Sequence, residues 1–109
     1  MATTYLLVYH GGGGMGQSEE ENQKIMAQWG EWMGKVGPNL ADGGKPVMAQ
    51  KTIAANGSVS DGGGAGAVNG YSLLTADSFD QAIALAKSCP HLAAGGTIQV
   101  CECADIPGM

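Results

Sequence analysis

Twice in this chain, a short apolar run is followed by a helix-start signal. The runs Tyr5–Tyr9 and Tyr71–Thr75 are rich in aliphatic and aromatic residues, as buried strands are. Ser18-x-x-Glu21 and Ser78-x-x-Gln81 then have the spacing of a capping box, in which the serine hydroxyl and the later side chain satisfy free backbone amides. Each run is therefore predicted to lead into a helix. A chain built from two such units must pack helices against a sheet.

The spacing of apolar residues predicts which face of each helix is buried. In the first helix these residues recur three, four and seven places apart: Ile25, Trp29, Trp32, Met33 and Val36. The second helix carries a shorter stripe: Phe79, Ala82, Ile83 and Ala86. Gly37-Pro38 is predicted to end the first helix and Cys89-Pro90 the second, because a proline excludes the residue before it from the α region.

The remaining segments complete the expected order of elements. Pro46–Ile53 is a weaker strand candidate, the Asn56-Gly57 dipeptide favours a tight turn, and Ser58–Ser60 is a possible return strand. Thr97–Cys103 is predicted to be the last strand. This order fits an α+β fold, a ferredoxin-like split βαβ sheet with two helices on one face. Two helices cannot cover the second sheet face, which is therefore expected to need another cover.

Composition narrows the classes of partner. A chain of 109 residues, 44% hydrophobic and 14% charged, is expected to form one domain spanning residues 1–109. The net charge is −5, arginine is absent, and the five lysines are scattered, so no basic stripe exists to follow a phosphate backbone. Nucleic acid is therefore not an expected partner. Apolar runs of near five residues fall far short of the roughly 20 that cross a membrane, so no membrane partner is expected either.

The expected location is cytoplasmic, since Met1–Thr4 lacks the charged region and long apolar core of a signal peptide. Three cysteines are an odd number for a disulfide framework, and Cys89, Cys101 and Cys103 are expected to be free thiols. Cys101 and Cys103 lie two apart on one predicted strand, where structural roles are favoured. A soft-metal site with a histidine is the alternative, but C-x-C lacks the paired C-x-x-C spacing, and no metal is expected.

Gly11, Gly13 and Gly16 match the G-x-G-x-x-G pattern of dinucleotide-binding proteins. The three glutamates Glu19–Glu21 follow at the start of the helix, where a pyrophosphate would have to lie. These charges oppose phosphate, so the glycines are interpreted as a flexible connection or a lid, and no cofactor is expected.

The segment Val59–Cys103, with its Asp61-Gly62 motif and Gly70-Tyr71 strand, resembles the YCII-related family of small α+β proteins. Together with the opening Tyr5–His10 and the helix containing Trp29, the resemblance covers most of the chain. It implies a dimeric α+β barrel, in which a second copy covers the open sheet face, and hence a homodimer. The motif commonly continues Pro-Phe in the family, whereas here it continues Gly63-Gly64.

Better-known members of this family carry a proposed catalytic pair, a histidine on the first helix and an aspartate just after the second. Here Gln28 and Trp29 stand in the histidine's place and Cys89 in the aspartate's, so the role of that pair is not transferred. His91, next to Pro90, is a candidate to act with His10 in its place.

The candidate catalytic residues are therefore His10 and Asp61. His10 ends the first strand, where a central strand gives way to a loop and a ligand cleft is common, and an imidazole can exchange protons near neutral pH. A strand-end hydrogen bond or dimer contact is the alternative role. Asp61, on a glycine loop, is the predicted carboxylate partner, and turn formation is its other interpretation.

Further candidate ligand contacts are Trp29, Asp42, Tyr71 and His91. A turn is favoured for Asp42, which precedes two glycines, and a core or interface position is favoured for Trp29. The sequence as a whole predicts a protein that binds an unknown small molecule, with weak acid–base catalysis as an additional possibility. The alternative is a non-catalytic dimerisation or interaction module.

Overall fold

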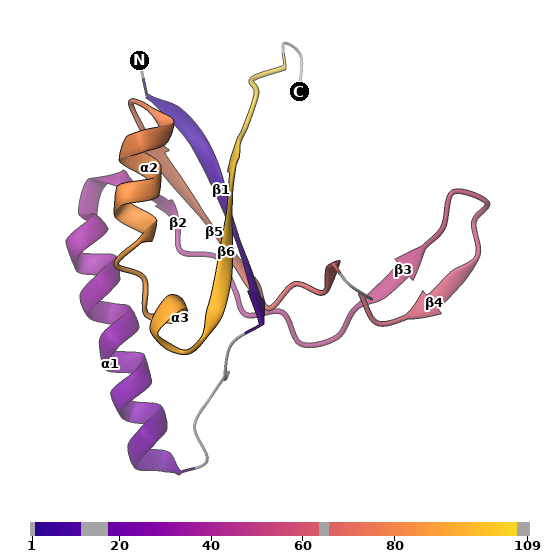
Figure 1. Cartoon of the computed structure of the whole chain (residues 1–109), viewed down its shortest axis with the longest axis horizontal. Helices are drawn as coiled ribbons and strands as arrows, with labels where there is room; N and C mark the ends of the chain where they lie inside the picture. The colour runs from indigo at the N-terminus through magenta and orange to yellow at the C-terminus, as the bar shows by residue number, and fades with distance from the viewer. Residues whose placement is uncertain (1, 12–17, 64–65, 107–109) are drawn as a thin grey trace.

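The structure, a computed structural model, describes residues 2–11, 18–63 and 66–106. It confirms the α+β class: helices lie on one side of a four-stranded antiparallel sheet, and a separate two-stranded hairpin projects from the body (Figure 1). The elements in chain order are β1 (Thr3–Gly11), α1 (Glu19–Val36), η1 (Gly37–Asn39), β2 (Leu40–Asp42), β3 (Lys51–Ile53), β4 (Val59–Asp61), β5 (Gly70–Ala76), α2 (Phe79–Ala86), α3 (Pro90–Ala93) and β6 (Gly96–Glu102).

The strands of the main sheet lie in the order β2-β5-β1-β6. β1 is central and pairs antiparallel with both neighbours, so that Leu7 lies opposite Ser72 on one side and Val100 on the other. β1 and β2 are joined through α1 but separated in the sheet by β5, and β5 and β6 are likewise separated by β1. Each strand–helix–strand unit is therefore split by a strand of the other unit.

The core lies between this sheet and the helices. Tyr5, Leu7 and Tyr9 alternate along β1 toward the helical side, where they are buried. Trp32 and Val36 of α1 pack against Leu7 and Tyr9, as the predicted apolar stripe requires. The stripe of α2 is only partly buried: Ala82 and Ala86 are in the core. Phe79 and Ile83, also predicted to face the sheet, are exposed, although the Phe79 ring packs edge-on against Tyr5, with a 5.1 Å centroid separation.

Both predicted helix starts are confirmed by their caps. The Ser18 hydroxyl accepts from the Glu21 amide at 3.1 Å, and the Ser78 hydroxyl accepts from the Gln81 amide at the same distance. Gln81 in turn accepts from the amide of Asp77, 2.7 Å away. α1 ends at Gly37, whose φ of 54° suits glycine and lets its amide reach the Met33 carbonyl.

The second sheet face is open in the single chain. Leu6 of β1 lies between Leu73 of β5 and Cys101 of β6, and Val8 lies opposite Tyr71. These side chains alternate with the buried ones, so they face away from the helices, and they remain partly exposed. The expectation of an uncovered sheet face therefore holds for the single chain.

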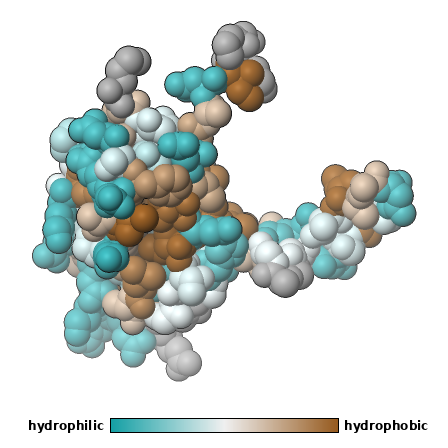
Figure 2. Space-filling model, turned by 45° about the horizontal axis from the view of Figure 1, so that its top comes forward, coloured by the Kyte–Doolittle hydropathy of each residue, from teal (hydrophilic) through white to brown (hydrophobic). Residues whose placement is uncertain are grey.

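The hairpin β3–β4 makes the molecule wide. The radius of gyration is 15.4 Å, compared with about 13 Å for a compact chain of this length. Residues 51–62 are all exposed, and Ile53 and Val59 lie opposite each other with 72% and 60% of their surface exposed. Hydrophobic side chains consequently gather both on the body and on this hairpin (Figure 2).

Three local expectations need correction. Pro46–Ile53 forms a strand only over Lys51–Ile53: Pro46 makes a single isolated bridge to Gly70, and residues 47–50 belong to no strand. β2 was not predicted, and it pairs with β5 through a register shift between Leu40 and Asp42. The short helix α3 starts at Pro90, where the sequence indicated only the end of α2. Gly13 and Gly16 of the glycine match lie outside the described residues.

Candidate functional site

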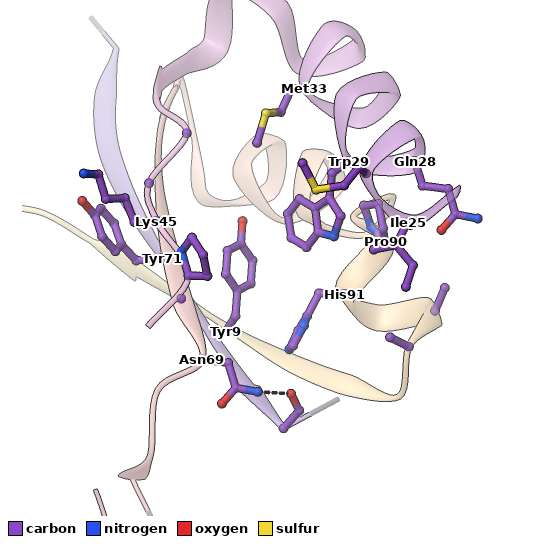
Figure 3. A pocket seen from close by; sticks show the side chains of 18 residues that line it. Tyr9, Ile25, Gln28, Trp29, Met33, Lys45, Asn69, Tyr71, Pro90 and His91 are labelled. Carbon is purple, nitrogen blue, oxygen red and sulfur yellow. Dashed lines mark hydrogen bonds between the residues drawn. The ribbon is translucent and has the colours of Figure 1, made fainter. Parts of the chain in front are cut away.

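A pocket of about 630 Å³ lies beside α1 on the helical side of the sheet (Figure 3). Its walls come from α1, from the C-terminal end of β1, from the segment around Gly43–Pro46 after β2, from the start of β5 and from α3. This volume is within the usual range of small-molecule sites, roughly 300–1,000 Å³. The pocket therefore forms where five separate parts of the chain meet.

Aromatic rings form one wall of the pocket. Tyr9 meets Trp29 edge-to-face at a centroid separation of 5.4 Å, and it meets the tilted ring of His91 at 5.2 Å. Trp29 packs edge-on against Trp32 at 5.8 Å, and the Trp32 indole N–H donates to the Leu85 carbonyl at 3.0 Å. This chain of contacts fixes the Tyr9, Trp29 and His91 rings around one cavity.

His91 is held in a defined tautomer. Its Nε2 lies 2.8 Å from the His10 carbonyl oxygen, which can only accept, so Nε2 carries a proton and donates. In the neutral ring, Nδ1 then holds a lone pair, and no described residue hydrogen-bonds to it. The ring is buried and packs against Gly96, where an added Cβ would lie 2.1 Å from Nε2. His91 therefore presents a fixed proton acceptor beside the pocket.

A buried polar chain lies behind the aromatic wall. The Tyr9 hydroxyl donates to Ser72 Oγ at 2.7 Å, and the Ser72 hydroxyl donates to the Gly43 carbonyl at 2.9 Å. Burial raises the pKa of the Tyr9 phenol far above its usual value, and burial likewise raises the pKa of the Cys89 thiol. Both groups therefore stay neutral at physiological pH, and Cys89 is not an activated nucleophile.

His10 contributes its backbone to this site, while its ring is engaged elsewhere. Its Nδ1 donates to the Ala67 carbonyl at 2.7 Å, and its Nε2 lies 3.0 Å from the side-chain amide oxygen of Gln99. By strand alternation, the ring shares the open sheet face with Val8, whereas Tyr9 faces the pocket. The structure thus brings His10 and His91 together through a main-chain carbonyl.

Asp61 ends β4 on the projecting hairpin (Figure 1), and it does not belong to the lining of the pocket. Its carboxylate is 3.4 Å from the Lys51 ammonium, and both side chains are strongly exposed. No hydrogen bond joins Asp61 to His10 among the described residues. The predicted imidazole–carboxylate pair is therefore not assembled in this conformation, and catalytic roles for the two residues stay predictions.

The other candidates are divided between the pocket and the loops. Trp29 and His91 line the pocket, and their role as ligand contacts stays a prediction. Tyr71 also belongs to the lining, but Figure 3 shows its ring across the strand from Tyr9. Asp42 accepts from the Gly44 amide at 2.8 Å and so forms the turn that the sequence favoured.

Sequence reasoning missed Tyr9 and Ser72 as parts of the site. Tyr9 is the last buried position of β1, which indicated only core packing, and Ser72 is a polar residue in a buried alternation along β5. A polar residue at a core position was the available signal, because it must find a partner there. Among the described residues, no group of three histidine, cysteine or acidic side chains is placed to hold a metal ion.

The described helices include none with the length and apolar character of a membrane span. The chain matches no protein-family model and no curated protein sequence.

Proposed function

We propose that this chain is a small-molecule-binding protein whose ligand occupies the pocket beside α1, with His91 as its acid–base group. One observation carries the proposal: an aromatic-walled cavity of about 630 Å³ is lined by an imidazole whose Nδ1 has no hydrogen bond to any described residue. A cavity of this size with a few placed polar groups is the usual form of a ligand site.

His91 has the geometry of a modest general base. A donor on the ligand would give its proton to Nδ1, while Nε2–H stays on the His10 carbonyl and keeps the ring oriented. None of the described lining residues is an aspartate or glutamate, so no carboxylate there stabilises the imidazolium that would form. Any catalysis is therefore expected to be weak.

We further propose that the chain is a YCII-related protein with a ferredoxin-like sheet, that it forms a dimeric α+β barrel, and that it is cytoplasmic. The strand order β2-β5-β1-β6, with both strand–helix–strand units split, supports the ferredoxin-like assignment. The open face around Leu6, Val8 and Leu73 supports a homodimer, since a second copy would remove this apolar surface from water.

The binding proposal is tested by following the two indole N–H signals in ¹⁵N–¹H spectra during a metabolite screen. The Trp29 indole lines the pocket, whereas the Trp32 N–H is bonded to Leu85, so a ligand should shift the Trp29 signal more. Trp29→Phe assigns the two signals. A screen in which neither signal moves and no compound raises the melting temperature would contradict the proposal.

A pocket-filling variant makes this test specific. A Cβ at Gly43 would lie 3.6 Å from the Met33 methyl group, an ordinary contact, so Gly43→Ala should preserve both the fold and binding. Gly43→Leu extends further in the same direction and should abolish binding. If Gly43→Leu binds as well as Gly43→Ala, the ligand lies elsewhere.

The non-catalytic interaction module remains the second candidate. The exposed hairpin favours it, because Ile53 and Val59 present an apolar pair with no core of their own. An isolated two-stranded hairpin is only marginally stable in water, so contact with a partner would stabilise it. A protein that dimerises but binds nothing in the screen would match this candidate.

A further inference from the structure

The described part of the pocket's inner wall, formed by Tyr9, Trp29 and His91, carries no fixed charge. Lys45 is the one lysine or acidic residue among the described residues that line the pocket. Figure 3 shows the Lys45 amine beside the Tyr71 ring, pointing away from Tyr9 and His91. An ionised ligand group at the Tyr9–His91 wall would therefore lose its hydration without gaining a counter-charge, which is strongly unfavourable.

The wall formed by Tyr9, Trp29 and His91 favours a ligand with a planar ring. The Tyr9 ring contacts the Trp29 ring at a centroid separation of 5.4 Å and the His91 ring at 5.2 Å, so three ring systems border one space. Met33 adds a flexible thioether to the same lining. Planar groups gain both apolar burial and edge-to-face contacts in such surroundings.

The hydrogen-bonding groups of this wall are mostly already engaged. The Tyr9 hydroxyl is bonded to Ser72, the amide of Asn69 donates to the Gly11 carbonyl, and His91 Nε2–H is bonded to His10. His91 Nδ1 is left as an acceptor that no described residue satisfies. A bound molecule with an O–H or N–H group can donate to it.

We infer that the ligand is an uncharged, ring-bearing molecule whose hydroxyl or N–H group donates to Nδ1 of His91. This inference rests on the proposed function, and it adds the chemical class of the ligand. Phenols, enols and neutral heteroaromatic N–H compounds belong to this class, whereas carboxylates, phosphates and amines are excluded by their charge.

Four small probes that share a six-membered aromatic ring test the class: phenol, anisole, benzoate and benzylamine. Binding to the full chain is measured from the Trp29 indole shift. Phenol should bind about fivefold to tenfold more tightly than anisole, because of these two neutral probes only phenol can donate to Nδ1. Benzoate and benzylamine should bind more weakly than anisole.

His91→Phe supplies the matched control, since it keeps a ring and removes the acceptor. It should bind phenol and anisole equally. Should this variant fail to fold, the preference for phenol over anisole in the unaltered protein decides the question alone.

Equal binding of phenol and anisole to the unaltered protein, or tighter binding of benzoate or benzylamine, overturns the inferred class while the pocket proposal stands. If none of the four probes shifts the signal but metabolites do, the class is again wrong. If nothing binds, the proposed function itself fails.

Discussion

The imidazole of His91 donates through Nε2 to the backbone carbonyl of His10, 2.8 Å away and 81 residues apart in the chain. This bond links α3 to the C-terminal end of β1, and it determines which nitrogen of His91 remains a proton acceptor. It therefore joins the stability of the fold to the chemistry of the pocket.

Removing His91 should destabilise the fold. In His91→Ala the carbonyl of His10 loses its side-chain donor, and the contact with the Tyr9 ring is lost as well. We expect the free energy of unfolding to fall by about 1–3 kcal/mol in urea titrations. Leu92→Ala, a change at the exposed neighbouring position on α3, is the control and should cost clearly less. Equal losses in the two variants would show that the His91 bond contributes nothing beyond helix packing.

Gly96 should not tolerate a methyl group. An added Cβ would lie 2.1 Å from Nε2 and 2.5 Å from Cε1 of His91, so the ring or the strand must move. Gly96→Ala is expected to lower the free energy of unfolding by about 1–3 kcal/mol and to weaken ligand binding. A Gly96→Ala protein with unchanged stability and unchanged binding would mean that His91 does not pack against Gly96 as described.

Gly34→Ala is the opposite case, because open space surrounds that helical glycine. It should raise the free energy of unfolding by about 0.5–1 kcal/mol through helix propensity.

The long periodic elements were predictable from sequence because their signals are local. The strand Tyr5–Tyr9 is marked by its own apolar run, and the helix after Ser18 by its periodicity and its cap, and both form as expected. The strand Leu40–Asp42 lacks such a signal. It is three residues long and is held by pairing with β5 and by the Asn39 side chain, which donates to the Thr75 carbonyl at 2.7 Å.

The site was less predictable, since it depends on tertiary contacts between distant segments. His91 was named as a candidate, but its hydrogen bond to a main-chain carbonyl of β1 leaves no trace in sequence. Conversely, Asp61 was prominent in sequence because of its glycine-rich context, and the structure places it on an exposed hairpin instead. The residue types indicated which side chains could take part in chemistry. Which of these side chains lie close together could be seen only in the folded structure.

Alkaline pH should destabilise the protein through two buried groups. Burial raises the pKa values of Tyr9 and Cys89 in the folded state, above the unfolded values near 10 and 9. The stability that these two neutral groups contribute is therefore complete below pH 9. It is lost as the pH rises from each group's pKa in the unfolded chain toward its higher pKa in the folded chain.

Urea titrations between pH 7 and 11 should accordingly show a free energy of unfolding that declines above about pH 9. Cys89→Ala should reduce the slope of this decline near pH 9, even though the variant is less stable at pH 7. Identical slopes in the two proteins would indicate that the Cys89 thiol ionises without penalty in the folded state.

The last prediction concerns the open sheet face. If a second copy covers Leu6, Val8 and Leu73, a carboxylate placed among them would be buried without a counter-charge in the dimer, although it would reach water in the monomer. Leu73→Glu should therefore weaken dimerisation by at least about a hundredfold while the circular dichroism spectrum stays unchanged.

Sedimentation velocity should find twice the 11.0 kDa chain mass for the unaltered protein and a single chain mass for the Leu73→Glu variant at micromolar concentration. Ala27→Glu adds the same charge on the exposed side of α1, so it should remain dimeric. An unaltered protein that sediments as a monomer, or a Leu73→Glu variant that stays dimeric, would show that this face is not the dimer interface.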